Sequence, residues 1–205
     1  MFARGSAFVN RNPVTPTLVL LMGVIFIAEQ YVYAYSPSLF EFIFSGQGTL
    51  TPGLLLAPLS HGPLMTHFLP NMGLLFAVGW PLEAHLRQRN FLMFTAVTAY
   101  VPTFLQIGYS VVTTGTAGTV GFSGAIYAYP PALMCIRIRN RPLSEIGTGG
   151  YYALAMTVAI PFIVTGQLEF LSPLPGATVT HTVGYLFGFT YGLYYWKEDL
   201  IKSVF

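Results

Sequence analysis

A serine and a histidine that could act together as a nucleophile and its base interrupt apolar stretches of this sequence. Ser123 lies in the segment Gly-Phe-Ser-Gly-Ala, and His181 stands at the start of another apolar stretch. A serine hydroxyl becomes nucleophilic when a neutral imidazole takes its proton, and the imidazole can then return that proton to a leaving amine. No Asp lies at a matching position, so the residues predict acyl transfer by a dyad of Ser123 and His181.

A second histidine and an asparagine could stabilise the oxyanion of such a reaction. His67 and Asn71 lie four residues apart, which places them on one face of a helix. Together with the Ser123 backbone N–H they could donate hydrogen bonds to a tetrahedral intermediate. Each residue also has a structural explanation when taken alone, because small residues, Asn and His commonly mediate contacts between membrane helices. The Gly-x-Ser-x-Gly elbow of soluble hydrolases does not fit, because Ala125 occupies its last position.

The composition indicates that the elements holding these residues lie in a membrane. Hydrophobic residues make up 54% of the chain and charged residues 8%, about a third of the charged share of a soluble domain. No linker or repeat divides the sequence, so we expect residues 1–205 to form one all-α membrane domain. Polar, Gly or Pro residues bound six apolar stretches, which predict spans at about 14–35, 63–84, 91–112, 121–136, 150–166 and 177–196, the fourth being the central helix.

The basic residues give an independent indication of topology. All nine Lys and Arg fall before the first stretch, between the second and third, between the fourth and fifth, or after the sixth. Cytoplasmic segments collect positive charge, so we expect six spans with both termini cytoplasmic. As a separate expectation, we assign the protein to a prokaryotic inner membrane. The same residues form no basic stripe, which argues against nucleic-acid binding. A cleaved signal peptide ending near Ala34 is the alternative for the first stretch, but its apolar run of about 20 residues is too long.

The candidate residues are expected at one depth. Sixteen positions separate Asn71 from Arg87, fourteen separate Ser123 from Arg137, and sixteen separate His181 from Lys197. At about 1.5 Å per residue the three groups lie ~24, ~21 and ~24 Å from the cytoplasmic charges, in the outer half of the bilayer.

Small residues should allow the helices of the dyad to approach closely. Gly184, Gly188 and Gly192 recur every fourth position of the sixth stretch, and Gly121 and Gly124 flank the serine in the fourth. The single cysteine, Cys135, has neither Cys nor His at metal-ligand spacing, so we expect no metal and no cofactor, and a packing role for this residue. Glu83, near the inner end of the second stretch, is expected to pair with Arg or backbone groups.

In this order and topology the motifs resemble the rhomboid intramembrane serine proteases. The resemblance spans residues 60 to 192 and rests on His67-x-x-x-Asn71, Gly121-x-Ser123-Gly124 and His181-x-x-Gly184. It implies a six-helix rhomboid-like bundle, with Ser123 as nucleophile, His181 as base, and His67, Asn71 and the Ser123 amide as the oxyanion hole. It further implies that Tyr127 packs against the catalytic histidine ring and that Glu83 is a structural glutamate.

The sequence departs from the family pattern in its first outer loop and at Pro70, and it has a further histidine, His61, next to the motif. The first outer loop, from Ser36 to Ser60, lacks the Trp-Arg pair that many members carry. Pro70 lies between His67 and Asn71, and a helix that began only near Leu69 would leave His67 outside it. His61 precedes His67 and could be a further histidine of the family type, but we expect it to be a solvated loop residue.

The resemblance implies an endopeptidase that cleaves single-span membrane proteins near the outer end of their spans, with membrane proteins and lipid as its partners. One alternative is a rhomboid-like pseudoprotease that binds clients without cleaving them, and retention of Ser123 and His181 argues against it. Another is a small transporter or channel, which the confinement of the polar groups to one level disfavours.

Overall fold

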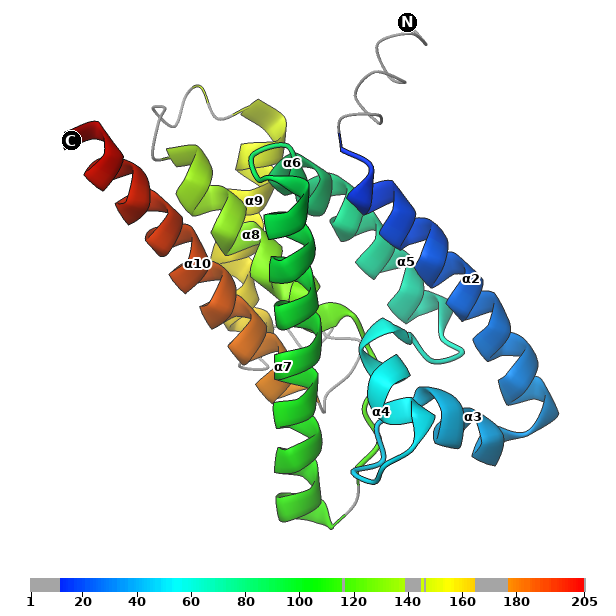
Figure 1. Ribbon diagram of the computed structural model, residues 1–205. Coiled ribbons are helices and arrows are strands. Elements are labelled where there is room, and N and C mark those ends of the chain that lie inside the picture. Colours follow the sequence, from blue (N-terminus) through cyan, green and yellow to red (C-terminus); the bar gives the residue numbers. More distant parts are fainter. Residues whose placement is uncertain (1–11, 116, 139–144, 146, 165–176, 205) are drawn as a thin grey trace, which may run out of the picture.

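The computed structural model describes residues 12–115, 117–138, 145, 147–164 and 177–204, and within them it is a bundle of helices (Figure 1). One isolated antiparallel bridge joins Gly46 to Thr119. The helical elements are α2 (Val14–Tyr35), α3 (Pro37–Phe44), α4 (Pro52–Leu56), η1 (Ala57–Leu59), α5 (Met65–Leu74), η2 (Leu75–Gly79), α6 (Trp80–Glu83), α7 (Gln88–Thr114), α8 (Ser123–Ile138), α9 (Gly147–Val164) and α10 (Thr178–Val204).

Helices occupy all six predicted stretches, the second one as the continuous series α5, η2 and α6. Among the described residues, two helices, Val14–Tyr35 and Gln88–Thr114, are long and apolar enough to cross a membrane by length and composition alone. A shorter apolar helix covers Gly150–Ile160. The all-helical class is thus observed, whereas the six spans and their orientation stay predictions.

The outward surface of α2 is apolar, the reverse of a helix on a soluble protein. Leu20, Val24, Ile27 and Tyr31 recur at helical spacing and are 57–76% exposed. The carboxylate of Glu29 on the same helix is fully buried. A soluble helix buries its apolar stripe and exposes its charges, so this arrangement indicates lipid as the surroundings of α2.

Helix α8 lies in the middle of the bundle, as predicted for the fourth stretch. Every residue from Ser123 to Leu133 is buried, and α10, α9 and α7 pack around it. The pair α8 and α10 makes the most extensive contact between helices. A Cβ at Gly184 or Gly188 would overlap the carbonyl of Gly124 or Ala128, so the predicted glycine ridge does allow these backbones to meet.

The second stretch is helical from Met65, so His67 lies inside the helix ahead of Pro70. The backbone N–H groups of His67 and Phe68 both donate to the carbonyl of Leu64, which starts the helix early. Pro70 removes only one hydrogen bond near that end, a loss that membrane helices tolerate.

Glu83 ends this series and holds the start of α2. Its two carboxylate oxygens accept the backbone N–H groups of Val14 and Thr15, each at 2.8 Å. A helix leaves its first N–H groups without internal partners, and a carboxylate there also meets the positive end of the helix dipole. The prediction that Glu83 pairs with backbone groups is confirmed.

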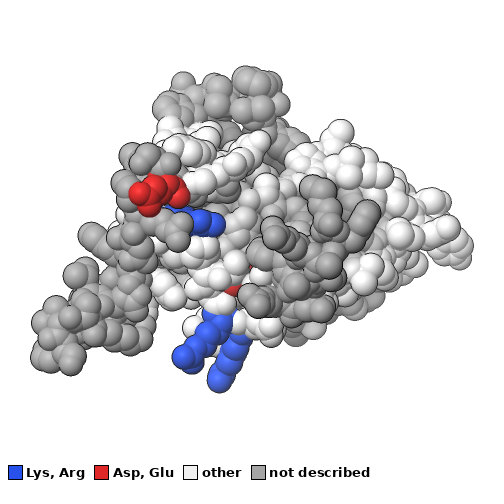
Figure 2. Space-filling model, turned by 90° about the horizontal axis from the view of Figure 1, so that it is seen from above, with Lys and Arg blue, Asp and Glu red and all other residues white. Residues whose placement is uncertain are grey.

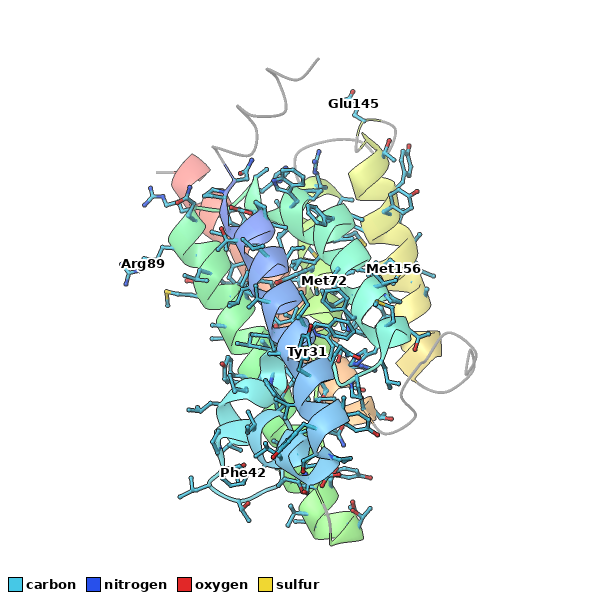
Figure 3. The ribbon with its side chains drawn as sticks, turned by 90° about the vertical axis from the view of Figure 1, so that its right-hand side faces the viewer. Tyr31, Phe42, Met72, Arg89, Glu145 and Met156 are labelled. Atoms are coloured by element: carbon cyan, nitrogen blue, oxygen red, sulfur yellow. The ribbon has the colours of Figure 1, made fainter. Side chains whose placement is uncertain are left out.

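The described arginines gather at one end of the bundle, which Figure 2 views end-on. Arg87 and Arg89 lie at the start of α7, and Arg137 lies in the last turn of α8. In Figure 3, Arg89 and Glu145 are at this end, whereas Phe42 on α3 is at the opposite one. We call the two ends the arginine end and the loop end.

Candidate active site

Ser123 and His181 meet near the first turns of two packed helices. Ser123 is the first residue of α8, and His181 is the fourth residue of α10. The His181 Nε2 atom lies 3.1 Å from the Ser123 Oγ atom, and each residue is 5% exposed. With its proton on Nδ1, the imidazole accepts the serine O–H, which is the arrangement a general base requires.

Tyr127 holds the imidazole plane. Its ring stacks on His181 with centroids 3.9 Å apart and planes 3° from parallel. Tyr127 lies one helical turn after Ser123 on α8, so the helix that carries the hydroxyl also carries the surface that orients its partner. In the described part of the chain, no carboxylate hydrogen-bonds to His181, and no group of three His, Cys, Asp or Glu could hold a metal ion.

The chain enters α8 through Gly121, a position that requires glycine. Its φ angle is +139°, in the region that side chains disfavour. A Cβ there would lie 3.2 Å from the His67 ring and 3.4 Å from the Ser123 Oγ atom. The Gly121 N–H donates to the Ala57 carbonyl at 2.8 Å. The missing side chain thus leaves a space that both the Ser123 hydroxyl and the His67 ring border.

Gln106, in the buried face of α7, caps the helix that carries His181. Its Oε1 atom accepts the backbone N–H groups of Val179 and Thr180 at 3.1 and 3.4 Å. These are first-turn donors that α10 cannot satisfy itself. The sequence interpretation did not include Gln106, although an uncharged polar side chain inside an apolar span is the signal that could have found it.

His67 is held in place by the backbone of the segment between η1 and α5. Its Nδ1 atom lies 2.9 Å from the carbonyl oxygen of His61. A carbonyl only accepts, so Nδ1 carries the proton, and the neutral ring then presents Nε2 as an acceptor. His67 can therefore donate to an oxyanion from Nε2 only as an imidazolium.

Asn71 lies one turn further along α5 and is 6% exposed. Its amide nitrogen, Nδ2, is buried and has no hydrogen-bond partner. Leaving a buried donor unused is costly, and such groups call for an explanation, of which a catalytic role is one. The unused amide is available to a developing oxyanion.

The prediction that His61 is solvated is wrong, because this residue is fully buried. Its ring packs edge-on against Phe68 and near His67. Its backbone N–H donates to both carboxylate oxygens of Glu29, at 3.2 Å each. Burial and the neighbouring His67 lower the pKa of His61 to about 3. Glu29, which the sequence interpretation missed, thus anchors the loop segment whose carbonyl orients His67.

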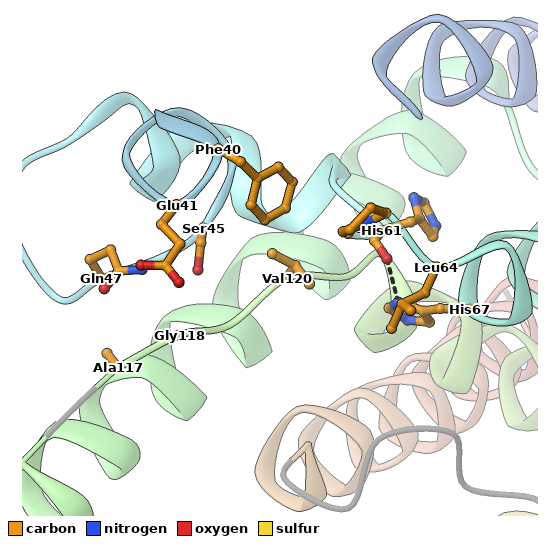
Figure 4. Close-up of a pocket in the computed structure, with 12 residues that line it drawn as sticks. Phe40, Glu41, Ser45, Gln47, His61, Leu64, His67, Ala117, Gly118 and Val120 are labelled. Atoms are coloured by element: carbon orange, nitrogen blue, oxygen red, sulfur yellow. Dashed lines mark hydrogen bonds between the residues drawn. The ribbon is translucent and has the colours of Figure 1, made fainter. Parts of the chain in front are cut away.

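A cavity of about 370 Å³ opens beside His67 at the loop end (Figure 4). The first loop and the segment before α8 form its walls. The lining residues are Phe40, Glu41, Ser45, Gln47, His61, Gly62, Pro63, Leu64, His67, Ala117, Gly118 and Val120.

The family model described as the rhomboid domain matches residues 50–198, which is most of the chain. The matched range contains Ser123, His181, Tyr127, His67 and Asn71. It leaves out α2 and α3, and with them Glu29. No curated protein matches the sequence.

Proposed function

The chain belongs to the rhomboid family, and we propose from this premise that it is an intramembrane serine endopeptidase that cleaves single-span membrane proteins. The rhomboid domain and the apolar helices indicate an integral membrane protein that acts on membrane proteins. The observation that carries the catalytic proposal is the 3.1 Å contact between the Ser123 hydroxyl and the His181 imidazole.

In the proposed reaction, the Ser123 Oγ atom attacks the scissile carbonyl while His181 Nε2 takes its proton. The new C–O bond makes an oxyanion, and collapse of this intermediate breaks the C–N bond as His181 protonates the leaving amine. Water then hydrolyses the acyl-enzyme, with the same imidazole as base. Tyr127 keeps the ring in plane through both steps.

The oxyanion would lie at the start of α8. The backbone N–H of Ser123 is in the first turn, where helix N–H groups lack internal acceptors and the helix dipole favours negative charge. The amide of Asn71 is the second proposed donor, because it is buried without a partner. His67 is the third, in its doubly protonated form.

The proposed topology has six spans, both termini in the cytoplasm of a prokaryotic cell, and one domain over residues 1–205. The loop end then faces outward, with Ser123 ~21 Å from the inner charges in a hydrocarbon core of ~30 Å. A substrate helix bonds its backbone internally, so it must unwind before a carbonyl reaches Ser123. Unwinding is easiest near outer water and small residues, so we expect cleavage near the outer end of the substrate span.

Labelling by a fluorophosphonate probe tests the proposal directly. The purified wild-type chain should be labelled and should cleave a single-span substrate, whereas Ser123→Ala should do neither. His181→Ala should lose cleavage to the same extent, because the two residues form one proton-transfer unit and their effects do not add. Labelling or cleavage that persists in Ser123→Ala contradicts the assignment, and a folded wild type that does neither indicates a pseudoprotease.

A further inference from the structure

The cavity beside His67 continues away from the dyad to an acidic side chain. One end is lined by His61 and His67, and the His67 ring lies beside Gly121 and thus beside Ser123. Figure 4 shows Glu41, Ser45 and Gln47 together at the other end. The cavity thus leads from the proposed oxyanion site to a carboxylate on α3.

Glu41 has no cationic counterpart at this end in the described residues. It is exposed and is the one charged residue of the segment from 36 to 60, and the segment from 113 to 119 contains none. The described arginines lie at the arginine end. A peptide that reaches Ser123 through the loop end therefore meets acidic charge without a competing cation from these segments.

We propose that Glu41 makes this cavity a subsite for a Lys or Arg side chain that lies on the outer side of the cleavage site. The inference rests on the proposed protease function and narrows its substrates. A volume of about 370 Å³ is ample for one long side chain.

The lining suits both parts of such a side chain. Phe40, Leu64 and Val120 provide apolar surface for the methylene stem. Glu41 supplies the charge, and the side-chain oxygens of Ser45 and Gln47 can accept further N–H groups. An acidic substrate side chain would face the Glu41 carboxylate instead and would be disfavoured.

A charge scan of a substrate tests this subsite. The full chain is reconstituted in liposomes with a cleavable single-span substrate in which each residue on the outer side of the cut is changed in turn to Lys, Gln or Glu. Lys and Glu versions compete in one reaction, and mass spectrometry of the products gives the ratio of their kcat/KM values. At one position Lys should be preferred by roughly two- to fivefold, the range of a partly exposed ion pair.

Variants of the protease then show whether the preference for Lys over Glu depends on Glu41. Glu41→Gln should bring the ratio to near one, and Glu41→Lys should reverse it. Gln47→Lys places a cation in the cavity with Glu41 intact and should also reduce the ratio. Glu145→Gln, the same change at the arginine end, should leave it unaltered. Raising the salt concentration should weaken the wild-type preference because exposed charges are screened.

The outcomes separate the two proposals. Cleavage that depends on Ser123 but shows no charge preference at any position overturns the Glu41 subsite and leaves the protease assignment standing. A preference that survives Glu41→Gln also overturns it. The absence of any cleavage that depends on Ser123 refutes the protease assignment, and the subsite falls with it.

Discussion

Replacement of Gln106 by Leu should slow proteolysis even though this side chain does not touch the dyad. The substitution removes the acceptor of two first-turn N–H groups of α10, of which that of Thr180 is buried. Loss of a helix cap costs about 0.5–2 kcal/mol, and a buried N–H left without a partner costs ~1–3 kcal/mol. His181 follows Thr180 directly, so fraying of this turn displaces the base.

The expected effect on rate follows from these energies. A cost of about 2 kcal/mol changes a conformational equilibrium by about thirtyfold, so kcat/KM should fall by up to about thirtyfold. Gln106→Glu keeps an oxygen acceptor and adds a charge that the helix N-terminus favours, so it should retain most activity.

The controls distinguish capping from packing. Ser110→Ala removes only the hydroxyl 3.1 Å from the Gln106 amide nitrogen and should leave kcat/KM within about twofold, since it does not touch the cap. Proteolysis of a transmembrane substrate and thermal unfolding are measured for all three variants. Wild-type kcat/KM in Gln106→Leu would refute the positioning role, and equal losses in Gln106→Leu and Gln106→Glu would show that shape, and not the acceptor, matters.

Two further predictions concern the oxyanion site and the loop that supports it. Asn71→Ala should lower kcat by roughly a hundred- to a thousandfold, the range for loss of one oxyanion donor, and a change in KM alone would show that Asn71 serves in packing or binding. Folding lowers the pKa of His61 from its ordinary 6.5 to about 3, so at a pH between these values His61 takes up a proton on unfolding. The melting temperature should therefore fall as the pH drops below about 6.5, and His61→Gln should fall less steeply; parallel pH profiles would contradict this.

The features of the site that could be predicted from the sequence depend on the spacing of residues along a single helix. Helical rise and the placement of basic residues predict one level for Ser123, His181 and Asn71, and Ser123 and His181 do lie within 3.1 Å of each other. The repeated glycines of α10 predict a close approach to another helix, and α8 makes that contact. Both arguments use distances along one helix, which the sequence contains.

The parts that could not be predicted depend on contacts between distant segments. His61 is buried, and its backbone N–H donates to Glu29, which lies 32 positions earlier. Gln106 caps a helix that begins more than 70 positions later. Spacing along the chain gives no information on such partners. In the sequence, such a contact is indicated only by a polar residue inside an apolar stretch. Several polar residues of this kind have no distant partner here; the Thr98 hydroxyl, for example, donates to the Phe94 carbonyl of its own helix.

The start of a helix is the structural feature that the site residues share. Ser123 opens α8, His181 lies in the first turn of α10, and His67 and Asn71 lie in the first two turns of α5. Each helix runs from the loop end toward the arginine end, so three positive dipole ends converge where, in the proposed reaction, the scissile carbonyl gains negative charge. In surroundings with little water these fixed dipoles act strongly and need no reorganisation during the reaction. This placement explains why the polar site residues stand near the starts of apolar stretches in the sequence. The first turn of an apolar helix offers both free N–H groups and a path to water from the loop end.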